Sequence, residues 1–331
     1  MPTIHDIAKL SGISKSTVSR VISKQGYVKK ETREKVEKAM KELNYTPNYI
    51  ARGMRTHKSS AIGLFIPDND NPFYSELFKG VEQVTRKAGY MNLVCHTDED
   101  PKTELFYINE LLKRQIDGII FCTYNRSHEG LRYLKEVAAN IPIIFMDPLF
   151  GDQGFSSVVS DGYTGSKMAV NYLYERGCSN IAYIKGSRIH AVTNERCKGY
   201  SDGLKEQGNK VLRQNVYEGD FSMESGRNAV KYFLSLDKKP DAIMAATDVM
   251  AIGALKELRK SGVKVPEDIK LIGFDNIPLA ELVEPALTTV AQPIKDLGIN
   301  AAELLLKKIQ NSATPNQQVV MQCSIIERDS T

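Results

Sequence analysis

The 331-residue sequence contains no tryptophan and only five histidines and five cysteines. The cysteines are scattered and never spaced C-x-x-C, and they are Cys95, Cys122, Cys178, Cys197 and Cys323. An odd number of unpatterned cysteines predicts reduced thiols in a cytoplasmic protein, with no disulfide framework. The histidines are separated and form no H-E-x-x-H pair, so we expect no metal site.

Long apolar runs are also missing. No segment approaches the roughly 20 apolar residues that a membrane helix needs, so we expect no membrane association. Residues 1–10 carry charges without an apolar run, which is not typical of a secretory signal peptide.

The sequence lacks the common loops of nucleotide-binding and hydrolytic enzymes. Neither G-x-G-x-x-G, nor G-x-x-x-x-G-K-[ST], nor G-x-S-x-G occurs. Residues 162–167 (G-Y-T-G-S-K) have the wrong spacing for a phosphate loop and are interpreted as a helix N-terminus. We therefore expect neither catalysis nor a cofactor.

Charge is unevenly distributed along the chain. Residues 1–60 hold 13 Lys and Arg against 5 Asp and Glu, whereas the remainder holds 31 against 35. A basic head on an acidic body indicates a polyanionic partner at one end only.

The basic head begins with two short amphipathic helices. Thr3 and Asp6 have the spacing of a capping box, and Gly12 predicts a tight turn after the first helix. A second helix is predicted over Ser14–Ile22, capped by Ser14, with Val18, Val21 and Ile22 facing inward. Two short helices around a glycine-containing turn are typical of a helix-turn-helix, whose second helix enters the major groove of DNA.

A third helix is predicted over Glu31–Leu43, followed by a connector that opens with Pro47. Residues 49–55 have room for about two helical turns, and Gly53 weakens them further. We expect this connector to order only when DNA and a second subunit hold it.

From Ala61 the pattern changes to alternating strands and helices, which predicts an α/β body with parallel sheets. The strand candidates are Ile62–Pro67, Met91–His96, Gly118–Thr123, Ile141–Met146, Ser157–Ser160, Ile181–Lys185, Ala242–Ala246 and Lys270–Phe274. The helix candidates are Phe73–Ala88, Glu104–Gln115, Glu129–Ala138, Thr164–Arg176, Glu195–Gln207, Met223–Leu236, Val249–Lys260 and Ile294–Ile309. About nine such units exceed one sheet of ordinary size, so two subdomains are expected.

Polar residues follow several strands, where ligands bind in such sheets. They are Asp68, Asn69, Asp98, Asp147, Asp161, Asp220, Asp248 and Asp275. A lone Asp is more often a helix cap than a ligand contact. We interpret Asp161 and Asp248 as caps or loop braces.

Several motifs make the chain resemble the LacI/GalR (lactose/galactose repressor) family of transcription regulators. They are T-I-H-D-I-A-K-L-S-G-I-S-K-S-T-V-S-R-V-I, Y-T-P-N-Y-I-A-R-G-M, I-P-D-N-D-N-P-F-Y-S-E-L, N-I-A-Y-I-K-G, A-A-T-D-V-M-A-I-G-A-L, I-G-F-D-N and L-T-T-V-A-Q-P. The resemblance implies an all-α helix-turn-helix head at 1–46, a hinge helix at 47–60 and a body at 61–331 like the periplasmic sugar-binding proteins. The body would comprise an N-subdomain (61–161 and 291–320) and a C-subdomain (162–290 and 321–331), with three crossings between them.

The resemblance also assigns roles at the DNA. Lys15, Ser16 and Arg20 match base-reading positions, and lysine and arginine donate to guanine O6 and N7. Met54 matches the side chain that wedges between base pairs in the minor groove, with Ala51 beside it. The implied phosphate contacts, which position without specifying, are Thr3, Ser14, Thr17, Ser19, Tyr45 and Asn48. A plain linker with an incidental methionine remains the alternative for Met54.

The positions that match the family's effector contacts are Phe73, Asp147, Arg196, Phe221, Asp275 and Gln292, with His190 as a weaker candidate. Arg196 and Asp275 have the chemistry to bond sugar hydroxyls, and arginine also suits a phosphate or carboxylate. Phe73 and Phe221 offer flat apolar faces to a sugar ring. Simple core packing remains an alternative for both phenylalanines.

The resemblance therefore implies a cytoplasmic homodimeric regulator, usually a repressor, that binds a palindromic double-stranded DNA operator under control of a sugar or sugar phosphate. A solute-binding protein without a DNA role is the alternative, and the first 60 residues argue against it. The sequence ends just after the last strand, so no tetramerising C-terminal tail is expected. Lys295 and Glu303 depart from the catabolite-control branch, which argues against a protein co-repressor.

Overall fold

The computed structural model describes residues 2–23, 26–45, 59–122, 128–146, 154–188 and 190–331. The chain divides into two compact units, Met1–Ser59 and Ser60–Thr331, called here the head and the body. Within the described ranges no helix is long and apolar enough to cross a membrane. The predicted hinge helix at residues 49–55 lies outside the described residues.

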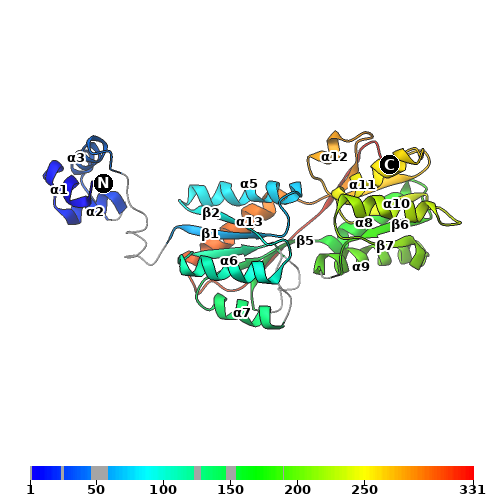
Figure 1. Ribbon diagram of the computed structural model, residues 1–331, viewed down its shortest axis with the longest axis horizontal. Coiled ribbons are helices and arrows are strands. Elements are labelled where there is room, and N and C mark those ends of the chain that lie inside the picture. Colours follow the sequence, from blue (N-terminus) through cyan, green and yellow to red (C-terminus); the bar gives the residue numbers. More distant parts are fainter. Residues whose placement is uncertain (1, 24–25, 46–58, 123–127, 147–153, 189) are drawn as a thin grey trace. The chain divides into compact units, whose positions relative to one another are not determined.

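The head contains three helices, α1 (Ile4–Ser11), α2 (Lys15–Ser23) and α3 (Lys30–Glu42) (Figure 1). Thr3 and Asp6 form the predicted capping box on α1, and Gly12 ends that helix at φ 68°. The Thr17 amide donates to Ser14 Oγ at 3.3 Å, as expected of a cap on α2. The buried side chains of the head form one small core: Ile7, Val18, Val21, Val36 and Ala39.

The body contains two six-stranded sheets, in the orders β11-β5-β4-β3-β1-β2 and β12-β10-β9-β8-β6-β7. The strands of the first sheet are β1 (Ala61–Ile66), β2 (Met91–His96), β3 (Gly118–Phe121), β4 (Ile143–Phe145), β5 (Ser156–Ser160) and β11 (Gln318–Met321). Those of the second are β6 (Ile181–Lys185), β7 (Val216–Glu218), β8 (Ala242–Ala245), β9 (Lys270–Asp275), β10 (Thr288–Ala291) and β12 (Ser324–Ile326). Every pairing is parallel except that of β10 with β12, so the predicted α/β class is confirmed.

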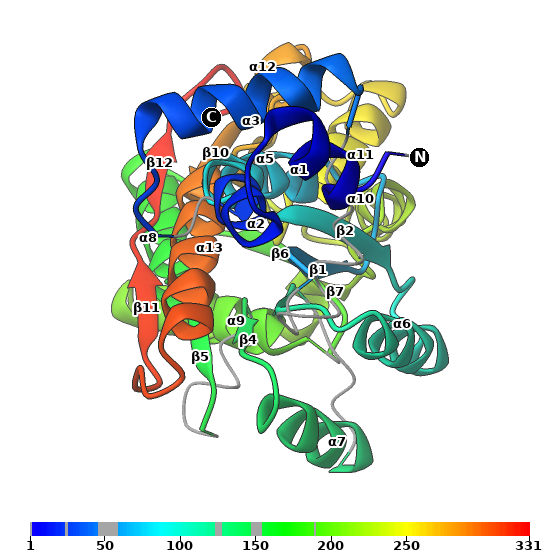
Figure 2. The same cartoon turned by 90° about the vertical axis from the view of Figure 1, so that its left-hand side faces the viewer.

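Helices cover both faces of the first sheet. They are α5 (Pro72–Lys87), α6 (Pro101–Lys113), α7 (His128–Ala138) and α13 (Ile294–Gln310). Ile62 and Leu64 of β1 pack with α5 and α13, whereas Phe65 packs with α6 and α7. Figure 2 shows the two pairs of helices on opposite sides of the sheet. A strand buried on both faces reads as a continuous apolar run, which is why β1 was predictable.

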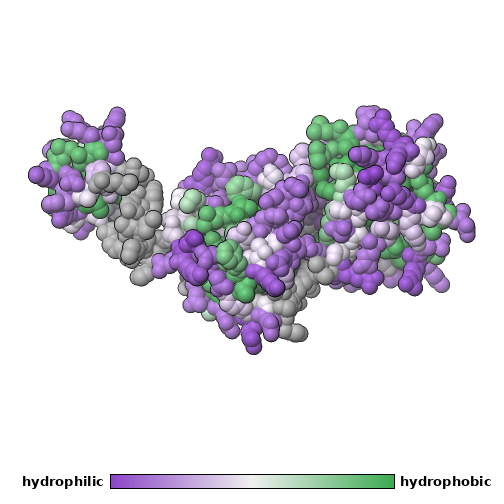
Figure 3. Space-filling view, in the orientation of Figure 1, coloured by the Kyte–Doolittle hydropathy of each residue, from purple (hydrophilic) through white to green (hydrophobic). Residues whose placement is uncertain are grey.

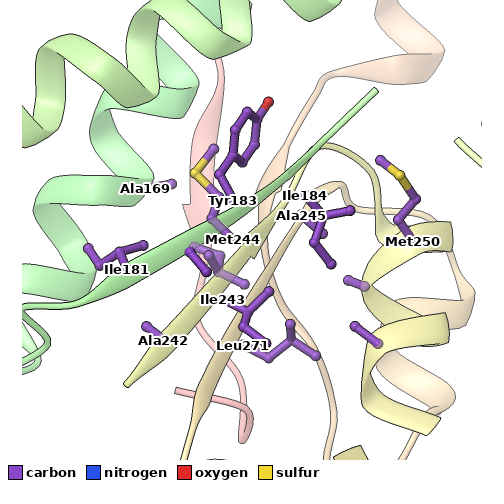
Figure 4. Close-up of a cluster of buried hydrophobic side chains, with 14 of the residues drawn as sticks. Ala169, Ile181, Tyr183, Ile184, Ala242, Ile243, Met244, Ala245, Met250 and Leu271 are labelled. Carbon is purple, nitrogen blue, oxygen red and sulfur yellow. The ribbon is translucent and has the colours of Figure 1, made fainter. Parts of the chain in front are cut away.

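The second sheet is covered in the same way by α8 (Gly162–Glu175), α9 (Ala191–Glu206), α10 (Met223–Leu234) and α11 (Asp248–Lys260). Its core includes fully buried Tyr183, Ile243 and Met244 (Figure 4). The described part of the body also contains two short elements, α12 (Leu279–Leu282) and the 3-10 helix η2 (Arg213–Asn215).

Sequence patterning missed the strands β7, β10, β11 and β12. Each is three or four residues long and contains a polar residue, so none shows the unbroken apolar run that made the equally short strands β3, β4 and β8 predictable. The chain crosses between the sheets after β5, after β10 and after β11. These crossings are set by strand pairing, which local sequence does not encode.

Candidate functional site

The first candidate site is the exposed face of α2 in the head. Val18 and Val21 anchor the helix in the core, and this orientation leaves Lys15, Ser16 and Arg20 exposed. Because α2 carries two cations and no acid, this face has the charge that suits a phosphate-rich surface.

Two of the predicted phosphate contacts, Thr3 and Ser14, lie at helix starts. Thr3 and Ser14 are exposed and their hydroxyls already serve as caps, while Thr17 and Ser19 are half-buried. Tyr45 packs partly against the head core. The predictions for Asn48, Ala51 and Met54 lie outside the described residues.

The second candidate site is a cavity of about 390 Å³ in the body. It lies beyond the carboxyl ends of the strands, where ligands bind in parallel α/β sheets. Residues following β1, β2, β3 and β4 line it together with residues following β6, β7, β8 and β10. Five of the predicted effector contacts line it, namely Phe73, Arg196, Phe221, Asp275 and Gln292, and so does the weaker candidate His190. Asp147 lies outside the described residues.

A buried polar set holds one wall of the cavity. Gln292 Nε2 donates to Asp275 Oδ1 at 2.6 Å, and Arg196 Nη2 lies 3.6 Å from the same oxygen. Arg196 Nη1 donates to the Ala246 carbonyl, and the guanidinium stacks 3.8 Å above the centroid of the Phe274 ring. Arg196 and Asp275 are 4% and 3% exposed. An ion pair this deeply buried is held by its additional hydrogen bonds.

Two carboxyl groups near this wall have raised pKa values. Burial raises the pKa of Asp275 to about 6, although Arg196 and the Gln292 hydrogen bond act to lower it. Burial also raises the pKa of Asp248, and the nearby charge of Asp275 raises it further. Asp248 accepts from the Ile277 amide at 2.9 Å and from Thr289 Oγ1 at 2.6 Å. Its predicted role as a loop brace is therefore confirmed.

Aromatic side chains form another part of the wall. The rings of Phe221 and His190 meet edge to face at 5.2 Å between centroids. Gly186 permits this placement, because a Cβ there would overlap the Phe221 ring. His190 Nε2 lies 3.0 Å from Glu99 Oε1, although the pair lacks hydrogen-bond geometry. Phe73 and Phe221 line the cavity, and each also packs against a hydrophobic core of the body.

Backbone strain is concentrated at the cavity. Asp98 (φ 51°), Glu99 (φ 55°), Phe221 (φ 69°) and Asp275 (φ 119°) all line it with positive φ. Such conformations cost of order 1–3 kcal/mol in non-glycine residues and are found most often at functional sites. Sequence analysis missed Tyr74, Glu99 and Ser160 as lining residues. The position of Ser160 at a strand end was a signal that we could have used.

Two family models match the chain. Residues 3–48 match the model described as bacterial regulatory proteins, lacI family. Residues 59–329 match the model of periplasmic binding proteins and the sugar binding domain of the LacI family.

Similar proteins span the whole chain. The ribose operon repressor of Halalkalibacterium halodurans is 36% identical over 331 residues, which is 100% of this chain and 97% of that protein. The solved complex of the transcriptional regulator CelR with cellobiose is 30% identical, with a TM-score of 0.76 and 100% of both chains covered. The Lac repressor dimer bound to operator and the anti-inducer ONPF is 26% identical, with a TM-score of 0.88 and coverage of 100% and 99%.

Proposed function

The chain belongs to the LacI family of bacterial regulatory proteins and is a DNA-binding transcriptional regulator, and we propose that it represses its target genes as a homodimer on a two-fold-symmetric operator. We propose further that a sugar bound in the body cavity sets its affinity for that operator. One observation carries the proposal: the same chain contains a helix with exposed Lys15 and Arg20 and a polar cavity lined by residues from two sheets. A solute-binding protein without a DNA role would not need the basic helix.

At the DNA, Lys15, Ser16 and Arg20 read base edges in the proposed complex. Their exposure on α2 supports this role, because burial of Val18 and Val21 leaves the opposite face free to enter the major groove. Thr3, Ser14, Thr17, Ser19, Tyr45 and Asn48 contact phosphates, and Met54 with Ala51 acts in the minor groove. This assignment places the operator-bound protein in the cytoplasm.

The homodimer is supported by apolar side chains on the outside of the first sheet. Met91 and Val94 on β2 are 63% and 46% exposed, and Leu105 and Phe106 on α6 are 46% and 59% exposed. Figure 3 shows hydrophobic residues gathered on this part of the body. Large apolar side chains that are exposed in one region of a surface are typical of a protein interface.

The effector role is supported by the composition of the cavity. Paired donors and acceptors on Arg196, Asp275 and Gln292 suit hydroxyl groups, and the rings of Phe73 and Phe221 suit the apolar face of a sugar. A ligand that contacts both sheets favours one arrangement of the two subdomains over the other. It shifts operator affinity only through its unequal affinity for those arrangements.

We also propose that the cavity binds and releases its ligand without changing it. The relatives that match the chain along its length are named as repressors and transcriptional regulators. Recovery of the ligand unchanged after prolonged incubation, measured by mass spectrometry, tests this statement.

The DNA role is tested by selecting binding sites from genomic fragments with the full chain. We expect enrichment of two-fold-symmetric sequences. Arg20→Ala should weaken binding to the selected site by about 10- to 100-fold, the value of one good base contact. Arg33→Ala on α3 removes the same charge from an exposed position outside the proposed interface and serves as the matched control. Equal losses for the two variants, or no symmetric site, would contradict the proposal.

A further inference from the structure

The described side chains that line the cavity carry an excess of negative charge. Five carboxylates line it in the described part of the chain, namely Asp68, Asp98, Glu99, Asp220 and Asp275. Among the same lining residues, Arg196 is the one guanidinium and there is no lysine. The described wall is therefore strongly acidic.

The single guanidinium is already engaged. Arg196 lies 3.6 Å from Asp275, donates to the Ala246 carbonyl and stacks on Phe274. Its buried Nε has no hydrogen-bond partner among the described residues. Pairing with Asp275 leaves this inner wall close to neutral, so Arg196 has no unbalanced charge to offer an anion.

The remaining four carboxylates also line the cavity. Asp68, Asp98, Glu99 and Asp220 are exposed and belong to turns that follow β1, β2 and β7. A phosphate entering the cavity would lose hydration and approach like charges. At about 4 Å, each such pair costs on the order of 1 kcal/mol in water and more near a protein surface. A neutral hydroxyl group is not repelled by the carboxylates and loses much less hydration energy.

We infer that the effector is a sugar that carries no phosphate or carboxylate group, and that the carboxylates around the cavity exclude its phosphorylated form. This inference rests on the proposed effector role and narrows the sugar or sugar phosphate expected from sequence to one chemical class. The inner pair and Gln292 bond hydroxyls, the rings of Phe73 and Phe221 contact the apolar face, and the acidic turns select against anions.

The test compares matched ligands on the full-length chain. Thermal unfolding is measured with a panel of free aldoses, ketoses and disaccharides, with the phosphate ester of each, and with inorganic phosphate. A ligand at 100 times its Kd stabilises the folded state by about 2.7 kcal/mol, which gives a readily measured rise in Tm. We expect at least one free sugar to raise Tm, its ester to bind at least 100-fold more weakly, and phosphate to have no effect.

Two results would overturn the inference: an ester that binds as tightly as its parent sugar, or no free sugar that raises Tm. Operator binding is measured on the same preparation. Loss of operator binding refutes the proposed regulator, whereas intact operator binding with a tight phosphate ester refutes only the ligand class.

Charge variants test the reason for the selectivity. Asp98→Asn removes one carboxylate from the cavity wall, and Asp237→Asn makes the same change at an exposed position away from it. We expect Asp98→Asn to reduce the ratio of ester Kd to free-sugar Kd several-fold at low salt, and Asp237→Asn to leave that ratio at its wild-type value. An unchanged ratio in Asp98→Asn would show that these charges do not select the ligand.

Discussion

Replacing Arg196 by alanine tests the central polar contact of the body. The change leaves Asp275 buried at 3% exposure without its cation, and it removes the hydrogen bond to the Ala246 carbonyl and the stacking on Phe274. Breaking a buried ion pair by removing one partner costs about 3–5 kcal/mol. Because Arg196 Nη2 and Asp275 Oδ1 are 3.6 Å apart, we expect a cost at the lower end of this range, about 3 kcal/mol. In a unit of this size, that loss lowers Tm by about 6 °C.

The loss of stability caused by Arg196→Ala should depend on pH, because Asp275 titrates near neutral pH in the folded state. The folded-state pKa of Asp275, about 6, lies above its ordinary value of 3.8, so the folded state binds the proton more tightly than the unfolded state. Without Arg196 this pKa rises further, because the guanidinium acts to lower it. Destabilisation by Arg196→Ala should therefore be largest above the raised pKa of the variant, and it should shrink as the pH falls from there to about 6 and the carboxyl group of the variant is protonated.

A double-mutant cycle with Asp275→Asn completes the experiment. Unfolding is followed by circular dichroism or tyrosine fluorescence, since the chain has 15 tyrosines and no tryptophan. In the Asp275→Asn background, Arg196→Ala should cost only about 1 kcal/mol, the value of an ordinary hydrogen bond. Equal costs in both backgrounds, or a cost that does not change with pH, would refute the reasoning.

Three further predictions concern the two sites. Affinity for a neutral sugar should fall as the pH drops through about 6, because protonation of Asp275 removes an acceptor; calorimetric titration from pH 7.5 to 5 that finds constant affinity would contradict this role. Gly186→Ala should displace the Phe221 ring and weaken sugar binding at least tenfold while operator affinity stays at its wild-type value; unchanged sugar affinity would remove Phe221 from the site. Val18→Ala should destabilise the small head core by about 2 kcal/mol. It should weaken specific and nonspecific DNA binding together, as measured by mobility shift. A loss of specific binding alone would mean that α2 keeps its core packing without this side chain.

Local sequence determined the elements of both units. The Thr3 and Asp6 capping box, the Gly12 turn and the 3.6-residue spacing of Val18 and Val21 settle α1 and α2, because each depends on residues within one or two helical turns. The buried strands of the body were predictable for a similar reason, since burial on both faces demands an unbroken apolar run.

The cavity depended on tertiary structure. Asp275 and Gln292 are separated by 17 positions, and Arg196 by 79 from Asp275, yet these side chains meet because β9, β10 and α9 are brought together by the second sheet. The family resemblance identified these residues as candidates, and the sequence also showed several aspartates that follow strands. Asp248 was interpreted as a brace and Asp275 as a ligand contact, but the partners that each carboxylate meets are set only after the sheets have formed. The acidity of the cavity has the same origin: Asp68, Glu99 and Asp220 are unrelated in sequence and share a wall only because parallel strands end at the same edge of their sheets.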